Sequence, residues 1–298
     1  MSHSPAHQPQ HSSRHQPTHA VQPRTHNAPK TSLARKNSTV AAFFDLDKTI
    51  IATSSAYVYG KEFLNSGLIS PTTALYLSLA KASYMFTGHT SEQLDNTRDQ
   101  LAAIIRGWDV AQISQIAREA LSTTVTPTIY AEARELIQGH LTLGHDVIIV
   151  SASATVIIAP IAEELGVTTV IGTILSEKDG KFTGEIEFYC KGEAKATALQ
   201  HLAIERGYDL QQSYAYSDSI TDLPMLEAVA HPVAVNPDRA LRKYAQEHGF
   251  EIRSFRNPVP LITLPSSRDL TVGTGVIAGL AALTAATMWW LKRPPTSA

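Results

Sequence analysis

A short uncharged run in this chain ends in two carboxylates that are one residue apart. Residues 40–44 read Val-Ala-Ala-Phe-Phe, and Asp45 and Asp47 follow directly. The run has no helical period, which is typical of a buried strand near the centre of a parallel sheet. Both carboxylates then lie at the C-terminal edge of the sheet, where open α/β folds bind ligands. Carboxylates beside apolar residues are costly to leave unpaired, so the pattern favours a divalent cation; a turn capped by the aspartates is the alternative.

Three further motifs follow along the chain. An apolar run at 147–150 ends in a Ser-Ala-Ser triplet, and Lys195 lies on a predicted helix. A third strand, at 213–216, ends in Ser-Asp-Ser, and Asp222 comes four residues after that aspartate. Each motif alone has a plainer interpretation, because the serines and acids can cap helices and the lysine can lie on the surface. Three strand ends that carry polar side chains together favour one shared site at the sheet edge.

Strands and helices alternate through most of the chain, which predicts a Rossmann-like, doubly wound parallel sheet covered by helices on both faces. An Asp-Gly turn at 179–180 predicts one β-hairpin. Residues 54–125 have apolar residues at helical spacing and no strand pattern, which predicts an all-helical insertion after the first strand. The other predicted strands are 170–174 and 233–235, and the other predicted helices are 129–140, 155–165, 193–206 and 238–247.

The four motifs together resemble the haloacid dehalogenase (HAD) superfamily, specifically its subfamily IB hydrolases, the branch that contains phosphoserine phosphatase. The resemblance is carried by Asp45-x-Asp47-x-Thr49, Ser151-Ala152-Ser153, Lys195, and Ser217-Asp218-Ser219 with Asp222. It implies a catalytic core at 39–57 and 126–262 and a small helical cap at 58–125. It also implies an Mg²⁺-dependent phosphatase that acts on a small phosphomonoester.

The resemblance assigns a role to each motif residue. Asp45 would be the nucleophile that forms an aspartyl-phosphate, and Asp47 the general acid and base. Mg²⁺ would be held by Asp45, by the backbone carbonyl of Asp47 and by Asp218. The phosphate would be bound by Ser151, the amide of Ala152 and Lys195, and Asp222 would orient the site from behind. Lys191 is a rival for Lys195, but only the spacing from Lys195 to Asp218 resembles that of the family.

The chain departs from the phosphoserine-specific pattern in three places. Ser54 stands where those enzymes carry an acid that binds the substrate ammonium, so the substrate is left open. Ser217 replaces the commoner glycine and Thr221 a usual asparagine, while both carboxylates of that motif are kept. Arg98 and Arg106 in the insertion are candidates for binding a second anionic group.

Both ends of the chain differ in composition from its middle. Residues 1–38 are rich in His, Pro and Gln and predict a disordered arm. Its histidines recur every four residues, but prolines between them oppose the helix that would make a metal-binding stripe. Residues 270–291 carry no charge and end in Trp289-Trp290 before Lys292, which predicts a transmembrane helix, because about 20 apolar residues span a bilayer. A soluble alanine-rich helix is the alternative.

These features lead to a predicted location and to several functions that stay open. With no secretory signal near Met1, we expect a single-pass C-terminal anchor in the cell membrane and a cytoplasmic catalytic domain. Gly275 and Gly279 form a G-x-x-x-G step that could pair two such helices into a homodimer. A net charge of −2 implies no nucleic-acid partner, and the lone Cys190 excludes an internal disulfide. Besides phosphoserine-like substrates, the alternatives are a membrane lipid phosphate such as lysophosphatidate, a phosphotransferase, and a non-catalytic membrane scaffold.

Overall fold

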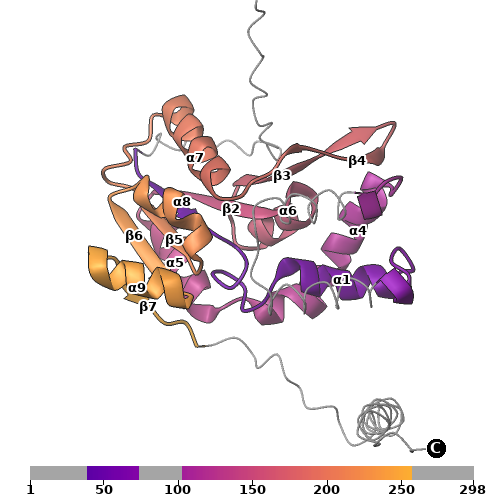
Figure 1. Ribbon diagram of the computed structural model, residues 1–298, viewed down its shortest axis with the longest axis horizontal. Coiled ribbons are helices and arrows are strands. Elements are labelled where there is room, and N and C mark those ends of the chain that lie inside the picture. The colour runs from indigo at the N-terminus through magenta and orange to yellow at the C-terminus, as the bar shows by residue number, and fades with distance from the viewer. Residues whose placement is uncertain (1–38, 74–102, 257–298) are drawn as a thin grey trace, which may run out of the picture. The chain divides into compact units, whose positions relative to one another are not determined.

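The computed structural model describes residues 39–73 and 103–256 (Figure 1). Within these residues the strands form one seven-stranded sheet in the order β4-β3-β2-β1-β5-β6-β7. All neighbouring strands are parallel except β3 and β4, which form an antiparallel hairpin. The strands are β1 (Ala41–Phe44), β2 (Asp146–Ala154), β3 (Thr169–Lys178), β4 (Lys181–Phe188), β5 (Tyr214–Ser217), β6 (His231–Val235) and β7 (Glu251–Arg253).

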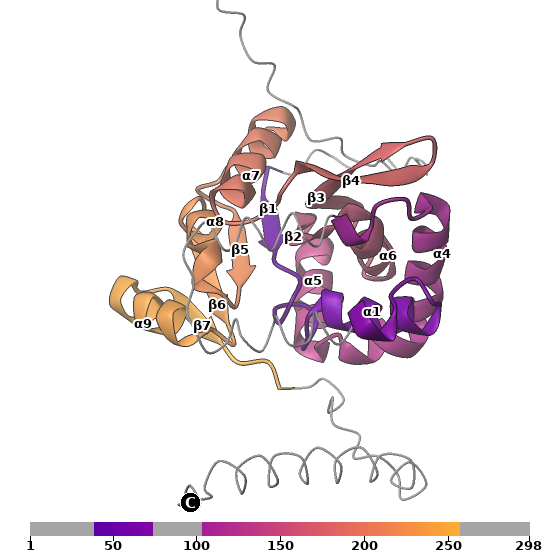
Figure 2. The same cartoon turned by 45° about the vertical axis from the view of Figure 1, so that its right-hand side comes forward.

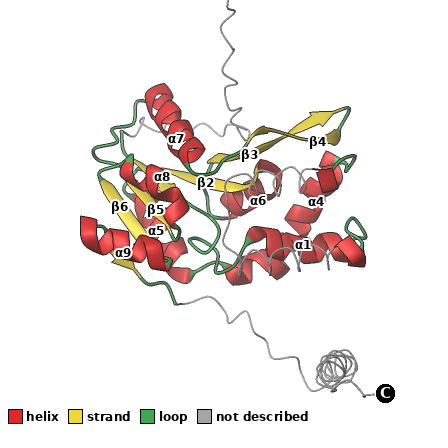
Figure 3. Cartoon of the chain, viewed as in Figure 1, coloured by secondary structure: helices red, strands yellow, loops and turns green. Residues whose placement is uncertain are grey.

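Helices cover both faces of the sheet (Figure 3). The α-helices include α1 (Ser55–Asn65), α4 (Val110–Ala120), α5 (Ala131–Thr142), α6 (Thr155–Glu164), α7 (Glu193–Arg206), α8 (Leu223–Glu227) and α9 (Arg239–His248). A π-helical turn (Leu121–Val125) and two 3₁₀ turns (Thr126–Thr128 and Ile220–Asp222) connect them. The apolar side chains of α5 and α6 belong to one buried cluster and those of α7, α8 and α9 to another. The predicted doubly wound architecture is therefore present.

The central strand β1 contributes to both cores, as an uncharged run predicts. Ala42 and Phe44 belong to the α5 and α6 side, while Ala41 and Phe43 belong to the other. All four are at most 1% exposed, because successive strand residues point to opposite faces of the sheet. The strand lies between β2 and β5 (Figure 2). Strands β2, β3 and β4 lie on one side of β1, and β5, β6 and β7 lie on the other. Open α/β sheets bind ligands where the strand order reverses in this way, so the ligand-binding crevice is expected at the C-terminal end of β1.

The hairpin differs from the rest of the parallel sheet in direction and in neighbours. Asp179 and Gly180 both have positive φ, 52° and 74°, as expected for a two-residue hairpin turn. Beyond the sheet, the hairpin pairs with the segment that leads into α4. Phe182 exchanges backbone hydrogen bonds with Gly107 and Trp108, at 2.8 and 3.0 Å. The part of the helical insertion that precedes α4 is therefore fixed to the hairpin.

The predicted boundary of the cap at residue 58 falls inside a helix. Helix α1 is continuous from Ser55 to Asn65, and its first residues contact the sheet edge described below. Helix α4, also within the predicted cap, packs against the core helix α6. Residues 74–102 of the predicted cap lie outside the described residues, as do the predicted arm at 1–38 and the predicted transmembrane helix at 270–291. Among the described residues no helix is both long enough and apolar enough to cross a bilayer.

Candidate active site

The predicted nucleophile and metal ligand lie side by side at the edge of two adjacent strands. Asp45 directly follows β1 and Asp218 directly follows β5. The strands are in register, with Phe44 opposite Tyr216. The Asp45 amide donates a hydrogen bond to the Tyr216 carbonyl at 2.9 Å, which continues the ladder by one residue. The parallel pairing therefore fixes the backbone positions of Asp45 and Asp218 relative to each other.

Lys195 joins two carboxylates at the centre of this edge. Its Nζ lies 2.6 Å from Oδ1 of Asp45 and 2.7 Å from Oδ2 of Asp222. The ammonium is buried, with the lysine only 2% exposed, near the N-terminus of α7. Ser217 also donates to Asp222 Oδ2, at 2.7 Å. Asp222 therefore orients the ammonium, and the ammonium in turn orients Asp45.

The buried edge carries more negative than positive charge. Burial raises the pKa of Asp45 well above its usual range, and the charges of Asp222 and Asp47 add to the rise, while Lys195 opposes it. Burial alone would lower the pKa of Lys195, but Asp45 and Asp222 raise it above its ordinary value. Burial also raises the pKa of Asp218 to about 6. Such an excess of buried carboxylates favours the binding of a cation.

Asp47 is held by the first residues of α1. The backbone N–H of Ser55 donates to Oδ1 at 2.9 Å, and the Ser54 hydroxyl donates to Oδ2 at 3.3 Å. A sharp turn brings the chain there: Lys48 has φ of 62°, and the Leu46 carbonyl accepts the next three amides of the turn. Burial raises the pKa of Asp47, although the hydrogen bonds from Ser55 and Ser54 lower it. The carboxyl group is thus fixed in place and biased toward its protonated form.

The serine triplet closes the site at the end of β2. Ser151 is 2% exposed, and its Oγ accepts the Ser153 amide at 3.2 Å. The Ala152 carbonyl accepts the Thr173 hydroxyl at 2.6 Å, so the Ala152–Ser153 peptide is held at both its polar atoms. An added Cβ at Gly172 would lie 2.7 Å from the Ile158 side chain. The same Cβ would lie 3.1 Å from the Ser153 carbonyl, so a larger residue at position 172 would have to displace its neighbours on α6 and at the end of β2.

The oxygen donors at this edge fit a magnesium ion. Mg²⁺ prefers carboxylate and carbonyl oxygens together with water. Asp45 and Asp218 supply carboxylates, and in the described part of the chain no backbone hydrogen bond ends on the Asp47 carbonyl. The described residues hold no cluster of three or more His, Cys, Asp or Glu side chains that could bind a metal. The predicted magnesium ligands include only two such side chains, those of Asp45 and Asp218. The third predicted ligand is the backbone carbonyl of Asp47.

The loop after β5 is fixed by a residue that the sequence motifs did not include. Asp238, which caps α9, accepts the Ile220 amide at 3.0 Å, and its own amide donates to the Asp218 carbonyl at 2.8 Å. These contacts hold Asp218 and the following 3₁₀ turn in place. The buried hydroxyl of Thr49 has no hydrogen-bond partner among the described residues. Neither feature has a local sequence pattern that would reveal it.

Two of the other candidate residues make none of the contacts described above. Lys191, the rival of Lys195, is half-buried and makes none of the ion pairs found in the described residues. Arg106 is exposed, and Arg98 lies outside the described residues. The roles assigned to the motif residues remain predictions, but the structure brings Asp45, Lys195 and Asp222 into contact, with Asp47, Ser151 and Asp218 at the same edge.

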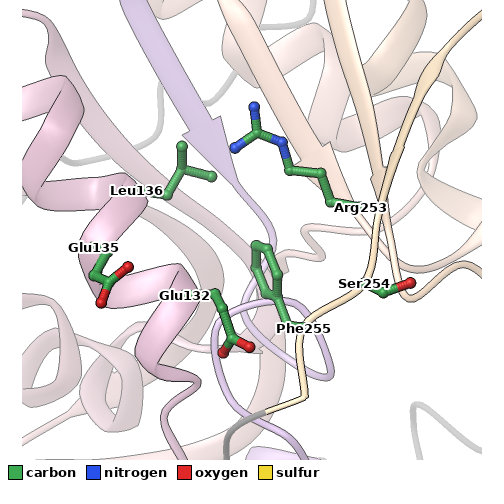
Figure 4. Close-up of a pocket in the computed structure, with 6 residues that line it drawn as sticks. All are labelled: Glu132, Glu135, Leu136, Arg253, Ser254 and Phe255. Atoms are coloured by element: carbon green, nitrogen blue, oxygen red, sulfur yellow. The ribbon is translucent and has the colours of Figure 1, made fainter.

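A separate hollow of about 460 Å³ lies beside the last strand (Figure 4). Its walls come from α5 on one side and from the segment that begins at the end of β7 on the other. The hollow contains none of the predicted site residues, so it is distinct from the candidate active site. It is lined by Glu132, Glu135, Leu136, Arg253, Ser254 and Phe255.

Comparison with known proteins identifies the family. The model for the haloacid dehalogenase-like hydrolases matches residues 42–227. A probable phosphatase of Mycobacterium tuberculosis is 47% identical over 82% of this chain and 86% of its own length. The chain therefore belongs to the haloacid dehalogenase-like hydrolases, and the predicted family is confirmed.

More distant relatives narrow the class of enzyme. A phosphoserine phosphatase of Mycobacterium tuberculosis is 36% identical over 82% of this chain and 80% of its own. A histidinol-phosphatase of Neisseria meningitidis is 33% identical over 72% of this chain and 98% of its own. The prediction of a phosphatase related to phosphoserine phosphatase is confirmed by these relatives.

A solved structure agrees on the fold. The phospho-aspartyl intermediate analogue of phosphoserine phosphatase superimposes with a TM-score of 0.54, covering 74% of this chain and 94% of that one. Its sequence identity is 19%, so the likeness extends to the fold alone.

Proposed function

We propose that this chain hydrolyses phosphomonoesters with Mg²⁺ through an aspartyl-phosphate on Asp45. The observation that carries the proposal is the position of Lys195, whose buried ammonium bridges Asp45 and Asp222 at the crevice of the sheet. A phosphomonoester resists attack because its oxygens are negative, so positive charge must be supplied and the nucleophile held in line. Lys195 provides charge beside Asp45, and its second partner keeps it from moving.

In the first half of the reaction, Asp45 attacks phosphorus and the bond to the substrate alcohol breaks. Ser151 Oγ and the Ala152 amide bind phosphate oxygens, as the resemblance implies. Asp47 gives its proton to the departing oxygen, and burial, which raises the pKa of Asp47, favours the protonated form that this step requires. The products are a free alcohol and a phosphoryl group on Asp45.

In the second half, Asp47 accepts a proton from water, and the water oxygen attacks the phosphoryl group. The bond to Asp45 breaks, inorganic phosphate leaves, and both aspartates return to their starting states. Asp45, the Asp47 carbonyl and Asp218 would hold Mg²⁺, which neutralises charge on the transferred phosphoryl group. The helical insertion over the site would exclude bulk water.

The substrate class follows from two of the relatives and from Ser54. Phosphoserine and histidinol phosphate, which the relatives' names specify, are both phosphate esters of 2-amino alcohols. In this chain Ser54 is neutral and hydrogen-bonded to Asp47. We therefore propose a small alkyl phosphate as substrate. Because Ser54 carries no charge, it does not require an amine on the substrate.

The test is phosphate release by the full chain with and without Mg²⁺, beside Asp45→Asn. The panel is phosphoserine, histidinol phosphate, lysophosphatidate and a sugar phosphate. Mg²⁺-dependent release that disappears in Asp45→Asn supports the proposal. A folded protein that neither binds Mg²⁺ nor releases phosphate from any ester contradicts it and favours the scaffold.

A lipid phosphate is the second candidate, because residues 270–291 are uncharged and long enough for a membrane helix. That segment lies outside the described residues, so the anchor and the cytoplasmic orientation are proposals. Sedimentation of the full chain with membranes, compared with a chain that ends at residue 262, tests the anchor. Preference for lysophosphatidate over phosphoserine would select the lipid function.

A further inference from the structure

A pair of serine hydroxyls connects the end of β2 to the beginning of α1. Ser153 Oγ and Ser55 Oγ lie 2.6 Å apart, although 98 residues separate them in the chain. Ser55 is fully buried, while Ser153 is half-buried at the strand end. A hydroxyl pair at this distance is a short and well-formed hydrogen bond. It is a direct polar link between the serine triplet and the helix that holds Asp47.

Each serine of this pair also contacts a predicted active-site residue. Ser55 donates its backbone N–H to Asp47 Oδ1 at 2.9 Å. Ser153 donates its backbone N–H to Ser151 Oγ at 3.2 Å. The pair therefore lies between the proposed general acid and the proposed phosphate-binding hydroxyl.

Either hydroxyl of the pair can be the donor. Each hydroxyl has one proton to donate and can accept at its lone pairs. The bond between Ser153 and Ser55 therefore forms whichever of the two hydroxyls donates. At Ser151 the oxygen accepts an amide, so its own proton is left to point at a phosphate oxygen. The arrangement gives each serine one role.

The same bonds select which oxygen of Asp47 can carry the proton that is transferred. A backbone N–H always donates, so Oδ1, which accepts from Ser55, is engaged in both protonation states. Oδ2 has only the longer contact from the Ser54 hydroxyl, at 3.3 Å. A hydroxyl can turn its proton away and accept instead. The transferable proton therefore belongs on Oδ2.

We propose that Ser55 and Ser153 are positioning residues, which hold the general acid Asp47 in register with the phosphate-binding end of β2. The inference rests on the proposed function and adds to it two residues that make no contact with the reacting atoms. Their effect is on proton donation to the leaving alcohol. They act through Asp47, with Ser55 touching it and Ser153 supporting Ser55.

Leaving groups of different basicity separate this role from simple structural support. An alkyl alcohol must be protonated as it leaves, whereas p-nitrophenolate leaves readily as an anion. The value of kcat/KM reports phosphoryl transfer to the enzyme, which is the step in which the leaving group departs. We expect Ser55→Ala to lower kcat/KM roughly tenfold or more for the best alkyl phosphate of the panel. For p-nitrophenyl phosphate we expect a change below about twofold.

Variants at the second serine test the connection. Ser153→Ala should reduce alkyl phosphate turnover in the same direction but less, and Ser153→Thr, which keeps the hydroxyl, should restore it. Because Ser153 acts through Ser55, the double alanine variant should lose no more kcat/KM for the alkyl phosphate than Ser55→Ala alone. If the two serines acted independently, their losses would add.

Ser66→Ala is the matched control, because Ser66 ends the same helix by donating its hydroxyl to the Glu62 carbonyl at 2.9 Å. It should leave the ratio of the two kcat/KM values unchanged. Thermal unfolding of every variant shows whether it is folded.

The outcomes are distinct for the two proposals. Equal losses on both leaving groups in folded Ser55→Ala would overturn the positioning role while leaving the phosphatase intact. Additive losses in the double variant would overturn the link between Ser153 and Ser55. A wild type that hydrolyses neither ester would overturn the proposed function, and the positioning role with it.

Discussion

The ammonium of Lys195 lies 2.6 Å from the carboxylate of Asp45, although 150 residues separate the two in the chain. The contact depends on the crossing of the chain from one side of β1 to the other, since α7 lies between β4 and β5 in sequence. Both groups are buried, with side chains 3% and 8% exposed. An ion pair removed from water in this way is sensitive to the loss of either partner.

Replacement of Lys195 should therefore affect both activity and stability. Lys195→Met leaves two buried carboxylates facing each other without a cation. We expect phosphate release to fall at least about a hundredfold and the free energy of unfolding to drop by about 3–5 kcal/mol in the absence of Mg²⁺. Chemical denaturation and steady-state kinetics measure the two effects.

Lys191→Met is the control for that experiment, because Lys191 is half-buried on the same stretch and makes none of the described ion pairs. It should change activity less than about twofold and stability by less than about 0.5 kcal/mol. If both lysine variants behave alike, Lys195 does not have the role that its position indicates.

Mg²⁺ should stabilise the folded protein through Asp218. A ligand that binds only the native state stabilises it by about 2.7 kcal/mol at a concentration 100 times its Kd. We expect Mg²⁺ to raise the Tm of the wild type and to have almost no effect on Asp218→Asn. Asp179→Asn, at the tip of the hairpin, should respond like the wild type, because asparagine also accepts the positive φ found there. An undiminished response in Asp218→Asn would place the metal elsewhere.

The stability of the fold should decrease in acid because of His140. This histidine is buried near the C-terminal end of α5, where Nε2 lies 2.8 Å from the Tyr216 hydroxyl and Nδ1 lies 2.9 Å from Nδ1 of His145. Burial lowers its pKa to about 4, and the charges of His145 and Arg253 add to the effect. In the unfolded chain the pKa is near the ordinary value of about 6.5.

The sign follows from proton binding. Between pH 6.5 and 4 the unfolded chain binds a proton that the folded one does not, so the stability present above pH 6.5 is lost as the pH falls to about 4. Over that interval the contribution of His140 amounts to roughly 3 kcal/mol. His140→Gln should show a flatter pH dependence of the unfolding free energy. His201→Gln, at an exposed position on α7, should retain the slope of the wild type.

Substrate selection should show little preference for an amine. Ser54 donates to Asp47 and has no charge to pair with an ammonium group. We expect kcat/KM for ethanolamine phosphate and for ethyl phosphate, which differ only in the amine, to agree within about tenfold, the effect of about 1.4 kcal/mol. A preference of a hundredfold or more for the amine would contradict this expectation.

The local sequence pattern was sufficient to predict most of the strands and helices of the core. The five uncharged residues before Asp45 predicted β1, and the helical period after Gly192 predicted α7 with the bounds that the structure shows. The Asp-Gly turn predicted the hairpin. Strand β7, with only three residues, and the π-helical turn at Leu121–Val125 were missed, because so short a segment carries no measurable period.

The site was predictable to the extent that strand ends could be found. Parallel strands bring their carboxyl ends to one edge, so Asp45, Ser151 and Asp218 had to lie near one another. The contacts that orient them were not predictable. The hydroxyl pair of Ser55 and Ser153 and the support of Asp218 by Asp238 join residues that are distant in sequence, and serine and aspartate occur at many helix N-termini without such a function.

Trapping the covalent intermediate shows whether Asp45 carries the phosphoryl group. Borohydride reduces an acyl phosphate to an alcohol, so acid-quenched enzyme that has reacted with substrate and Mg²⁺ should yield homoserine in place of Asp45 by peptide mass spectrometry. The signal should be absent without substrate and in Asp45→Asn. Turnover by the wild type with the reduced residue at any other position, or with none, would contradict the account.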